Sequence, residues 1–338
     1  MPRSGARRPT LEDVAARAGV GRGTASRVIN GGARVSERAK EAVQRAIGEL
    51  GYIPNRAARS LAMQRTDAVA LVIAESEERF FGEPFFAGVV RGIGTALADV
   101  DRQLVLLLAP ADRTATLTDY LTHQHVDGVL LLSLHDDDSL AARIAEHGVP
   151  IVLGGGVPPR DGVGFVENDN AQGARLAVEH LLERGRRRIA TISGPLDMEV
   201  GRVRLRAYRG ALAAAGAEAS EDLVAVGDFS QASGEHAMRA LLDRRPDLDA
   251  VFCANDLMAA GALGVLREAG RRVPEDVAVV GFDDSRLALS THPRLTSVHQ
   301  SPEAMGHEMV AMLLDLMAGK VDVHARMLPT HLVVRESS

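Results

Sequence analysis

TLEDVAARAGVGRGTASRVIN, residues 10–30, predicts two short helices joined by a tight turn. Thr10 has an N-cap side chain, and Asp13 stands three residues further on, where it can complete a capping box. Gly19 ends the first helix, because glycine takes the left-handed conformation at low cost. This helix carries one apolar stripe at helical spacing, which consists of Leu11, Val14, Ala15 and Ala18.

The second helix of this stretch has an apolar and a polar face. Its inner positions are Ala25, Val28 and Ile29. Its outer face carries hydrogen-bond donors and no acid, namely Arg22, Thr24, Ser26, Arg27 and Asn30. A helix-turn-helix presents such a face to the major groove of DNA. The stretch therefore predicts a DNA-reading head, and the alternative is a set of surface helices of an ordinary globular domain.

A third helix and a linker complete the predicted head. Ser36 caps a helix that Gly51 ends, so we place the head at residues 9–51. Residues 52–65 follow as a hinge or linker, in which Pro54 biases the preceding residue away from helix. Three short helices bury little surface, which predicts that the head needs help from a partner.

Four motifs in this region, TLEDVAARAGV, TASRVIN, VSERAKEAV and ELGYIPNRAARSL, resemble the DNA-binding region of the lactose-repressor (LacI/GalR) family of bacterial transcription regulators. The resemblance implies a ligand-responsive repressor that binds a palindromic operator in double-stranded DNA as a homodimer. It also implies a hinge helix that inserts Leu61 into the minor groove, and the alternative is a flexible tether. The implied DNA contacts are Thr10, Arg22, Gly23, Thr24, Ser26, Arg27, Asn30, Tyr52, Asn55, Arg56, Ala58 and Leu61.

Charge is distributed unevenly along the 338 residues. Residues 1–65 contain thirteen Arg and Lys but five Asp and Glu, whereas the remainder contains 26 and 40. A basic head on an acidic body is typical of a nucleic-acid binder with a separate effector domain. A single cysteine, Cys253, fits a reducing compartment, and the sequence contains neither a secretory signal nor an apolar stretch of membrane-spanning length. We therefore expect a cytoplasmic protein with no membrane partner.

From residue 66 onward, short apolar runs alternate with helix-length stretches. Such runs are typical of strands buried on both faces of a parallel sheet, and they lie at 68–74, 103–109, 127–133 and 150–155, then at 188–194, 222–228, 250–255 and 277–284. Two successive doubly wound units predict an α/β effector domain with two lobes and a cleft. The two-lobed body resembles the periplasmic-binding-protein-like domain of the same family. We expect lobe 1 at about 66–163 and 297–325 and lobe 2 at about 164–296 and 326–338.

Polar and aromatic residues stand at the ends of several predicted strands, where open parallel sheets bind ligands. The resemblance implies an effector site that consists of Phe85, Arg204, Phe229, Asn255, Asp283 and Gln300. Carboxylates and amides pair with hydroxyls, and an aromatic ring covers the apolar face of a sugar, so this set favours a sugar effector. The alternatives are that Asn255 is an N-cap and that Asp283 caps the next turn.

Other functions find less support in the sequence. Residues 154–156 lack the GK[ST] of a phosphate loop, and His123 and His125 have no third metal ligand at suitable spacing. No GxSxG nucleophile motif occurs, so we expect no catalytic residues, no metal and no cofactor. A purine or a sugar phosphate stays open as the effector, and a solute-binding protein without DNA function is the alternative class. Gly21 replaces the family's usual serine cap, so some phosphate affinity is lost or passes to Arg22.

Overall fold

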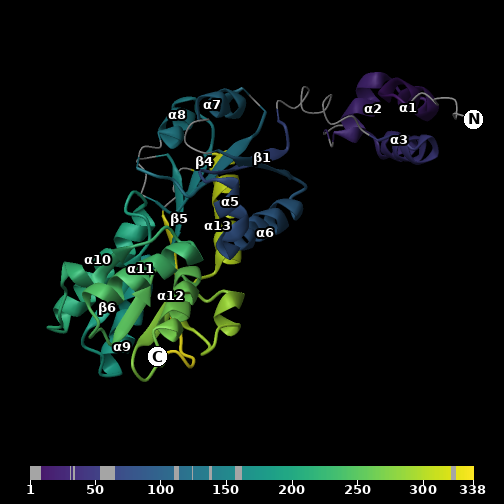
Figure 1. Ribbon diagram of the computed structural model, residues 1–338. Coiled ribbons are helices and arrows are strands. Elements are labelled where there is room, and N and C mark those ends of the chain that lie inside the picture. Colours follow the sequence, from purple (N-terminus) through teal and green to yellow (C-terminus); the bar gives the residue numbers. More distant parts are fainter. Residues whose placement is uncertain are drawn as a thin grey trace, which may run out of the picture. The chain divides into compact units, whose positions relative to one another are not determined.

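The computed structural model describes residues 9–30, 32, 35–53, 65–109, 114–123, 125–136, 139–156, 162–320 and 325–338. The chain divides into two compact units, Met1–Thr66 and Asp67–Ser338, and each is described by itself (Figure 1). Four of the residues expected to contact DNA, Asn55, Arg56, Ala58 and Leu61, lie outside the described residues. No helix in the described ranges is long and apolar enough to cross a membrane.

The head contains the three predicted helices, α1 (Leu11–Ala18), α2 (Arg22–Ile29) and α3 (Glu37–Leu50). The capping box is confirmed: the Asp13 amide donates to Thr10 Oγ1 at 3.3 Å, and the Thr10 amide donates to Asp13 Oδ2 at 2.8 Å. Gly19 and Gly51 both adopt left-handed backbone at the helix ends, with φ of 66° and 59°. The three helices enclose a small core, which includes Val14, Ala15, Ala25, Val43 and Ala46.

The first lobe of the larger unit is built on a parallel six-stranded sheet of order β11-β5-β4-β3-β1-β2. Its strands are β1 (Ala68–Ile73), β2 (Gln103–Leu108), β3 (Gly128–Leu132), β4 (Ile151–Gly154), β5 (Gly164–Asn168) and β11 (Arg326–Leu328). One face is covered by α6 (Pro84–Ala98) and α13 (Pro302–Met317), and the short helix α5 (Glu77–Gly82) precedes α6. The other face is covered by α7 (Thr114–Thr122) and α8 (Leu140–Glu146).

The second lobe repeats this architecture with a sheet of order β12-β10-β9-β8-β6-β7, in which only β12 is antiparallel to its neighbour. Its strands are β6 (Ile189–Ser193), β7 (Val224–Val226), β8 (Ala250–Cys253), β9 (Ala278–Asp283), β10 (Thr296–His299) and β12 (His331–Val333). The faces are covered by α9 (Asn170–Glu183) with α10 (Glu199–Ala214), and by α11 (Gln231–Arg244) with α12 (Asp256–Glu268). The predicted two-lobed α/β architecture is therefore confirmed.

Two details of the body differ from the sequence-based expectation. The chain changes lobes later than predicted, because β5 and β11 pair within the first sheet and β10 pairs with β9 in the second. An apolar run shows that a strand exists, but the pairing partner decides which sheet it joins. In addition, β2 is not buried on both faces, because it lies at the sheet edge with β1 as its only neighbour.

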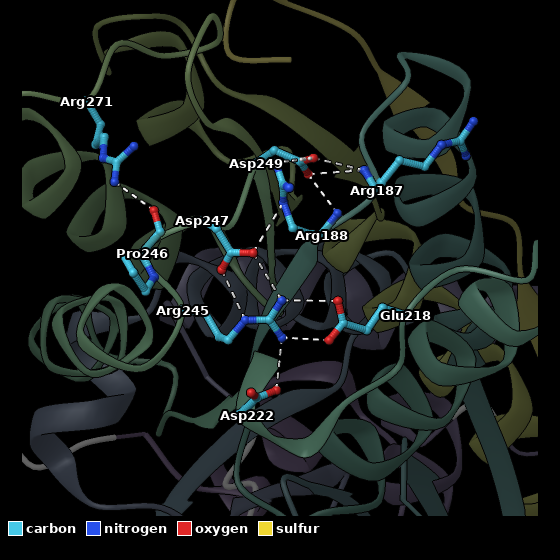
Figure 2. Close-up of polar contacts among 9 residues, drawn as sticks. All are labelled: Arg187, Arg188, Glu218, Asp222, Arg245, Pro246, Asp247, Asp249 and Arg271. Atoms are coloured by element: carbon cyan, nitrogen blue, oxygen red, sulfur yellow. Dashed lines mark hydrogen bonds and ion pairs between the residues drawn. The ribbon is translucent and has the colours of Figure 1, made fainter.

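An ion-pair network lies at the amino ends of the second sheet (Figure 2). Arg245 contacts the carboxylates of Glu218 at 2.7 Å and of Asp222 and Asp247 at 3.1 Å. Asp249, just before β8, accepts hydrogen bonds from the amides of Arg187 and Arg188, just before β6. These contacts hold the strand beginnings together, which leaves the carboxyl ends of the strands as the end where ligands bind in folds of this kind.

Candidate functional site

The candidate DNA-reading surface is the outer face of α2. Arg22, Gly23 and Arg27 are exposed there, whereas Thr24, Ser26 and Asn30 are partly buried. The side chain of Asn30 donates a hydrogen bond to Ser26 Oγ at 3.3 Å, so these two side chains are paired with each other in the absence of DNA. Gly21 is the N-cap of α2 and makes no side-chain hydrogen bond, which leaves the first amides of this helix open to a phosphate.

Two other expected DNA contacts have structural roles in the head. Thr10 caps α1, and Tyr52 packs against the head core. The outer face of α2 itself carries no acid, but an acid of the neighbouring helix α1 lies beside it. Glu12, from α1, places its carboxylate 2.9 Å from Nε of Arg22. Arg22, which the resemblance implies as a DNA contact, is therefore already paired in the free head.

The candidate effector site is a cavity of about 650 Å³ between the two lobes. Residues from both sheets line it, mostly at or just beyond the carboxyl ends of strands, as predicted for this type of fold. Of the six residues expected to contact effector, five lie in its wall: Phe85, Arg204, Phe229, Asp283 and Gln300.

Arg204 is the central buried cation of the cavity. Its Nε and Nη2 donate to Asn170 Oδ1 at 2.9 and 2.7 Å, and its Nη1 donates to the carbonyl of Ala254. Its guanidinium carbon lies 3.6 Å from the centroid of the Phe282 ring. Burial lowers the pKa of Arg204 to about 10, which still leaves it charged at neutral pH. Arg204 thus supports the local fold and faces the cavity.

Asp283, at the end of β9, has the backbone geometry of a functional position. Its φ of 107° is unusual for a residue other than glycine, and such conformations cluster at ligand sites. Its Oδ1 accepts a 2.6 Å hydrogen bond from Nε2 of Gln300. Burial raises the pKa of Asp283 well above its ordinary value, and the charge of Arg204 opposes that shift. Asp283 and Gln300 therefore form one polar pair in the wall.

Phe229 also has a left-handed backbone, with a φ of 70°, and its ring tip packs close to Gly194. The side-chain Nδ2 of Asn255 donates to the backbone carbonyl of Phe229 at 2.8 Å, and Asn255 Oδ1 accepts from the backbone amide of Met258 at 2.9 Å. Of the two roles considered for Asn255, the structure shows the N-cap, since this buried side chain is not in the cavity wall. Asn255 contributes to the site by holding Phe229.

The cavity wall contains three acidic residues that were not predicted from the sequence. Glu83, Glu167 and Glu199 join Asp283 there. Burial raises the pKa of Glu83, and it raises that of Glu167 to about 7 although Asn170 donates to its carboxylate at 3.0 Å. Against these acids the wall presents the guanidinium groups of Arg79 and Arg204. The wall is therefore acidic on balance.

One buried acceptor in the wall is left open. Asn168, at the end of β5, is 3% exposed, and its Oδ1 has no hydrogen-bond partner among the described residues. Its Nδ2 lies 3.5 Å from the sulfur of Met305. A buried unpaired amide oxygen in a cavity wall fits a donor that arrives with the ligand, because such groups are costly to leave unpaired. The position of Asn168 and Glu167 at a strand end was the signal that could have identified them.

Arg79, from α5, reaches from the first lobe to the second. It pairs with Glu75 at 2.7 Å and Glu83 at 3.4 Å, and its guanidinium carbon lies 5.1 Å from the centroid of the Phe229 ring. Nothing in the sequence marked this arginine for the site. The two residues that follow it do not line the cavity, because Phe80 is buried in the core and Phe81 is exposed elsewhere.

A second group of contacts joins the lobes next to the cavity. Arg202 Nη1 and Nη2 donate to both carboxylate oxygens of Asp136 at 2.5 and 2.8 Å. His135 Nδ1 lies 2.7 Å from Asp197, and its Nε2 lies 3.3 Å from Glu75. Because ionised carboxylates only accept, both ring nitrogens donate and the ring is charged. The hydrogen bond to Glu75 raises the pKa of His135 to about 9, and the hydrogen bond to Asp197 adds a smaller part of this increase.

Metal chemistry finds no support in the described ranges, where no group of three or more His, Cys, Asp or Glu side chains is placed to hold an ion. His123 bonds the backbone carbonyl of Asp119 and His125 stacks on Tyr120, so both histidines that were considered have local partners. Cys253 is fully buried.

Comparison with known proteins agrees with this geometry. Residues 10–55 match the model for bacterial regulatory proteins of the lacI family, and residues 178–338 match a periplasmic binding protein-like domain. The transcriptional regulator CelR of Thermobifida fusca is 56% identical over 98% of both chains. The repressor PurR of Klebsiella pneumoniae is 33% identical, over 94% of this chain and 95% of PurR.

Solved structures extend the likeness to three dimensions. A complex of the transcriptional regulator CelR with cellobiose shares 54% identity and a TM-score of 0.78, with 98% of this chain and 100% of that chain covered. A lac repressor dimer bound to operator and an anti-inducer shares 29% identity and a TM-score of 0.84, over 98% and 99% of the two chains. With a helix-turn-helix head, two parallel sheets around one cavity and relatives of this similarity, the chain belongs to the LacI family of bacterial transcriptional regulators.

Proposed function

We propose that this LacI-family regulator is a repressor that binds its operator as a homodimer and responds to cellobiose or a closely related β-linked glucose disaccharide. The relative with 56% identity is CelR, and the solved CelR structure with 54% identity contains cellobiose. The solved lac repressor is a dimer on its operator, which supports the same assembly here. These likenesses support the class of effector, and the chemistry of the cavity adds to that support.

The observation that carries the proposal is the mixture of groups in one cavity. The Phe229 ring supplies an apolar surface for a sugar face, and Phe85 lies in the same wall. The open acceptor of Asn168 suits a hydroxyl donor, and Asp283 offers a carboxylate that can accept from neighbouring hydroxyls. Arg204 keeps guanidinium hydrogens that can donate to sugar oxygens. A neutral polyol uses all of these groups.

The acidic groups of the wall argue against a sugar phosphate, which was one of the two alternative effectors within this family, beside a purine. Four carboxyl groups stand in the wall, those of Glu83, Glu167, Glu199 and Asp283, against two guanidinium groups. A phosphate entering this space would lose its hydration, and each of these carboxyl groups that is ionised would repel it. We therefore favour a neutral effector over an anionic one.

On the DNA side, we propose that Arg22 and Arg27 read base edges and that Thr24, Ser26 and the open amides at the start of α2 contact phosphates. We also propose that residues 52–65 act as the hinge, with Tyr52, Asn55, Arg56, Ala58 and Leu61 contacting the operator. These roles follow from the resemblance and from the exposure of α2.

Isothermal titration calorimetry of the full chain with cellobiose, maltose, glucose 6-phosphate and hypoxanthine tests the effector proposal. We expect cellobiose to bind about tenfold or more tightly than maltose, because the two linkages place the second ring differently against a preformed wall. Glucose 6-phosphate should show no binding that exceeds that of glucose. Binding of hypoxanthine without binding of cellobiose would overturn the proposal in favour of a purine effector.

A further inference from the structure

The DNA-facing surface of the head contains one ion pair whose position has a consequence for base reading. Glu12 is the second residue of α1, and Arg22 is the first residue of α2. Their contact, 2.9 Å from Oε1 to Nε, therefore joins the two helices of the helix-turn-helix across the turn between them. The side chains are 58% and 72% exposed, so the pair lies at the surface and is open to DNA.

The local sequence leaves Glu12 available for this contact. Asp13 completes the capping box with Thr10, so α1 does not need Glu12 as a cap. In α2 the first turn contains no acid, and its N-cap, Gly21, has no side chain. Glu12 thus brings a negative charge from one helix to the beginning of the next. An exposed pair of this kind contributes little to stability, so its position calls for another role.

The atoms used by the pair matter for recognition. Glu12 makes its closest contact with Nε of Arg22, and among the described residues no hydrogen bond is made by the fork, Nη1 and Nη2. That fork is the part of arginine that can donate to both O6 and N7 of a guanine. An arginine without a partner can instead turn toward any nearby phosphate, and a carboxylate beside it repels phosphates.

We propose that Glu12 is a specificity-determining positioning residue, which holds the Arg22 fork toward base edges and disfavours its use as a phosphate contact. The inference rests on the proposed base-reading role of Arg22. Glu12 itself need not touch DNA. Its effect is on how strongly the head distinguishes the base pair that Arg22 reads from the other three possibilities at that position.

The test uses the full chain and an operator selected from random DNA with the unsubstituted protein. Dissociation constants are measured at one salt concentration for this operator, for its single-base variants and for unrelated DNA. The variants are Glu12→Gln, Glu12→Asp, Arg22→Ala and the double variant Glu12→Gln/Arg22→Ala. Glu49→Gln is the matched control, because it removes an equal charge from the head and breaks another exposed ion pair between two of its helices, Arg17–Glu49. Thermal unfolding of each variant monitors the fold.

Glu12→Gln is expected to lower discrimination at the base pair read by Arg22 by about threefold or more, and to raise affinity for unrelated DNA. Glu12→Asp keeps the charge but shortens the side chain, so it should lose discrimination with a smaller gain in affinity for unrelated DNA. Glu49→Gln should raise affinity for all sequences alike. In the Arg22→Ala background, Glu12→Gln should have no further effect on discrimination.

Three results would overturn the proposal: unchanged discrimination in Glu12→Gln, an equal loss in Glu49→Gln, or a loss at a base pair other than the one that Arg22→Ala affects. The last result would mean that Glu12 reads a base itself, for example by accepting from a cytosine amine. Failure of the unsubstituted protein to select any operator would instead contradict the proposed function, so the two failures are distinguishable.

Discussion

At the scale of single residues, we expect effector recognition to depend most on Asp283, whose carboxyl group accepts from Gln300 and whose backbone conformation is strained. Asp283→Asn keeps the size of the side chain and one acceptor for Gln300 but replaces the other oxygen with a donor. We expect cellobiose affinity to fall by about 1–3 kcal/mol, because a sugar hydroxyl then faces a group that cannot accept. Calorimetry measures the loss, and operator affinity without effector serves as the control. Full cellobiose affinity in this variant would remove Asp283 from the site.

Phe229 permits a second test at this scale. Phe229→Leu keeps an apolar side chain but removes the flat ring, so we expect cellobiose affinity to fall by about 0.5–1.5 kcal/mol. Phe81→Leu is the matched control, because Phe81 is 78% exposed and outside the cavity wall. Equal effects of the two substitutions on calorimetric affinity would contradict stacking on Phe229.

The sequence could indicate candidate cavity residues where they follow a predicted strand. Arg204, Asp283 and Phe229 follow predicted strands, and the structure brings all three to one cavity. Prediction did not find Arg79, since its place in the wall depends on how α5 crosses to the second lobe. For Asn255 the sequence left two roles open, and only the hydrogen bonds to Met258 and Phe229 distinguish them.

At the scale of elements, the contact between α6 and α13 sets the shape of the first lobe. A Cβ at Gly92 would lie 2.1 Å from the backbone oxygen of Glu303, whereas a Cβ at Gly94 in the same helix would meet nothing within 4 Å. Gly92→Ala should lower the free energy of unfolding by about 1–3 kcal/mol, because the two helices must move apart. Gly94→Ala should raise it by up to about 1 kcal/mol, because alanine favours helix. Urea unfolding of both variants checks this, and equal effects would contradict the close helix contact.

Most helices and strands were predictable because their signals are local. Thr10, Gly19, Ser36 and Gly51 mark helix ends through side-chain and backbone preferences that act within a few residues. The assignment of β5, β10 and β11 to lobes was not predictable to the residue, since it depends on pairing between segments far apart in the sequence. The ion pair of Glu12 with Arg22 was missed for the same reason.

At the scale of the whole effector unit, His135 couples the two lobes through Glu75 and Asp197. Its pKa of about 9 lies above the ordinary value of 6.5, so its ion pairs contribute fully below about pH 6.5 and are lost as pH rises through 9. The free energy of unfolding should therefore fall by roughly 1–2 kcal/mol more in the unsubstituted protein than in His135→Gln between about pH 7 and 10.

Urea titrations at several pH values provide that measurement. His147→Gln is the control, because His147 is exposed and bonds the backbone of its own helix. Identical pH dependence in the unsubstituted protein and in His135→Gln would contradict a charged histidine between the lobes.

Across the whole protein, we expect binding of a ligand in the cavity to change the affinity of the head for its operator. Ligands that bind two arrangements of the lobes unequally must change operator affinity by the same factor as operator changes theirs. The direct measurement is fluorescence anisotropy of a labelled operator, titrated with the full chain at fixed salt in the absence and presence of saturating cellobiose. We expect operator affinity to change by about fivefold or more with cellobiose and not to change with maltose at equal concentration. Specific operator binding that is the same with and without cellobiose would contradict this expectation.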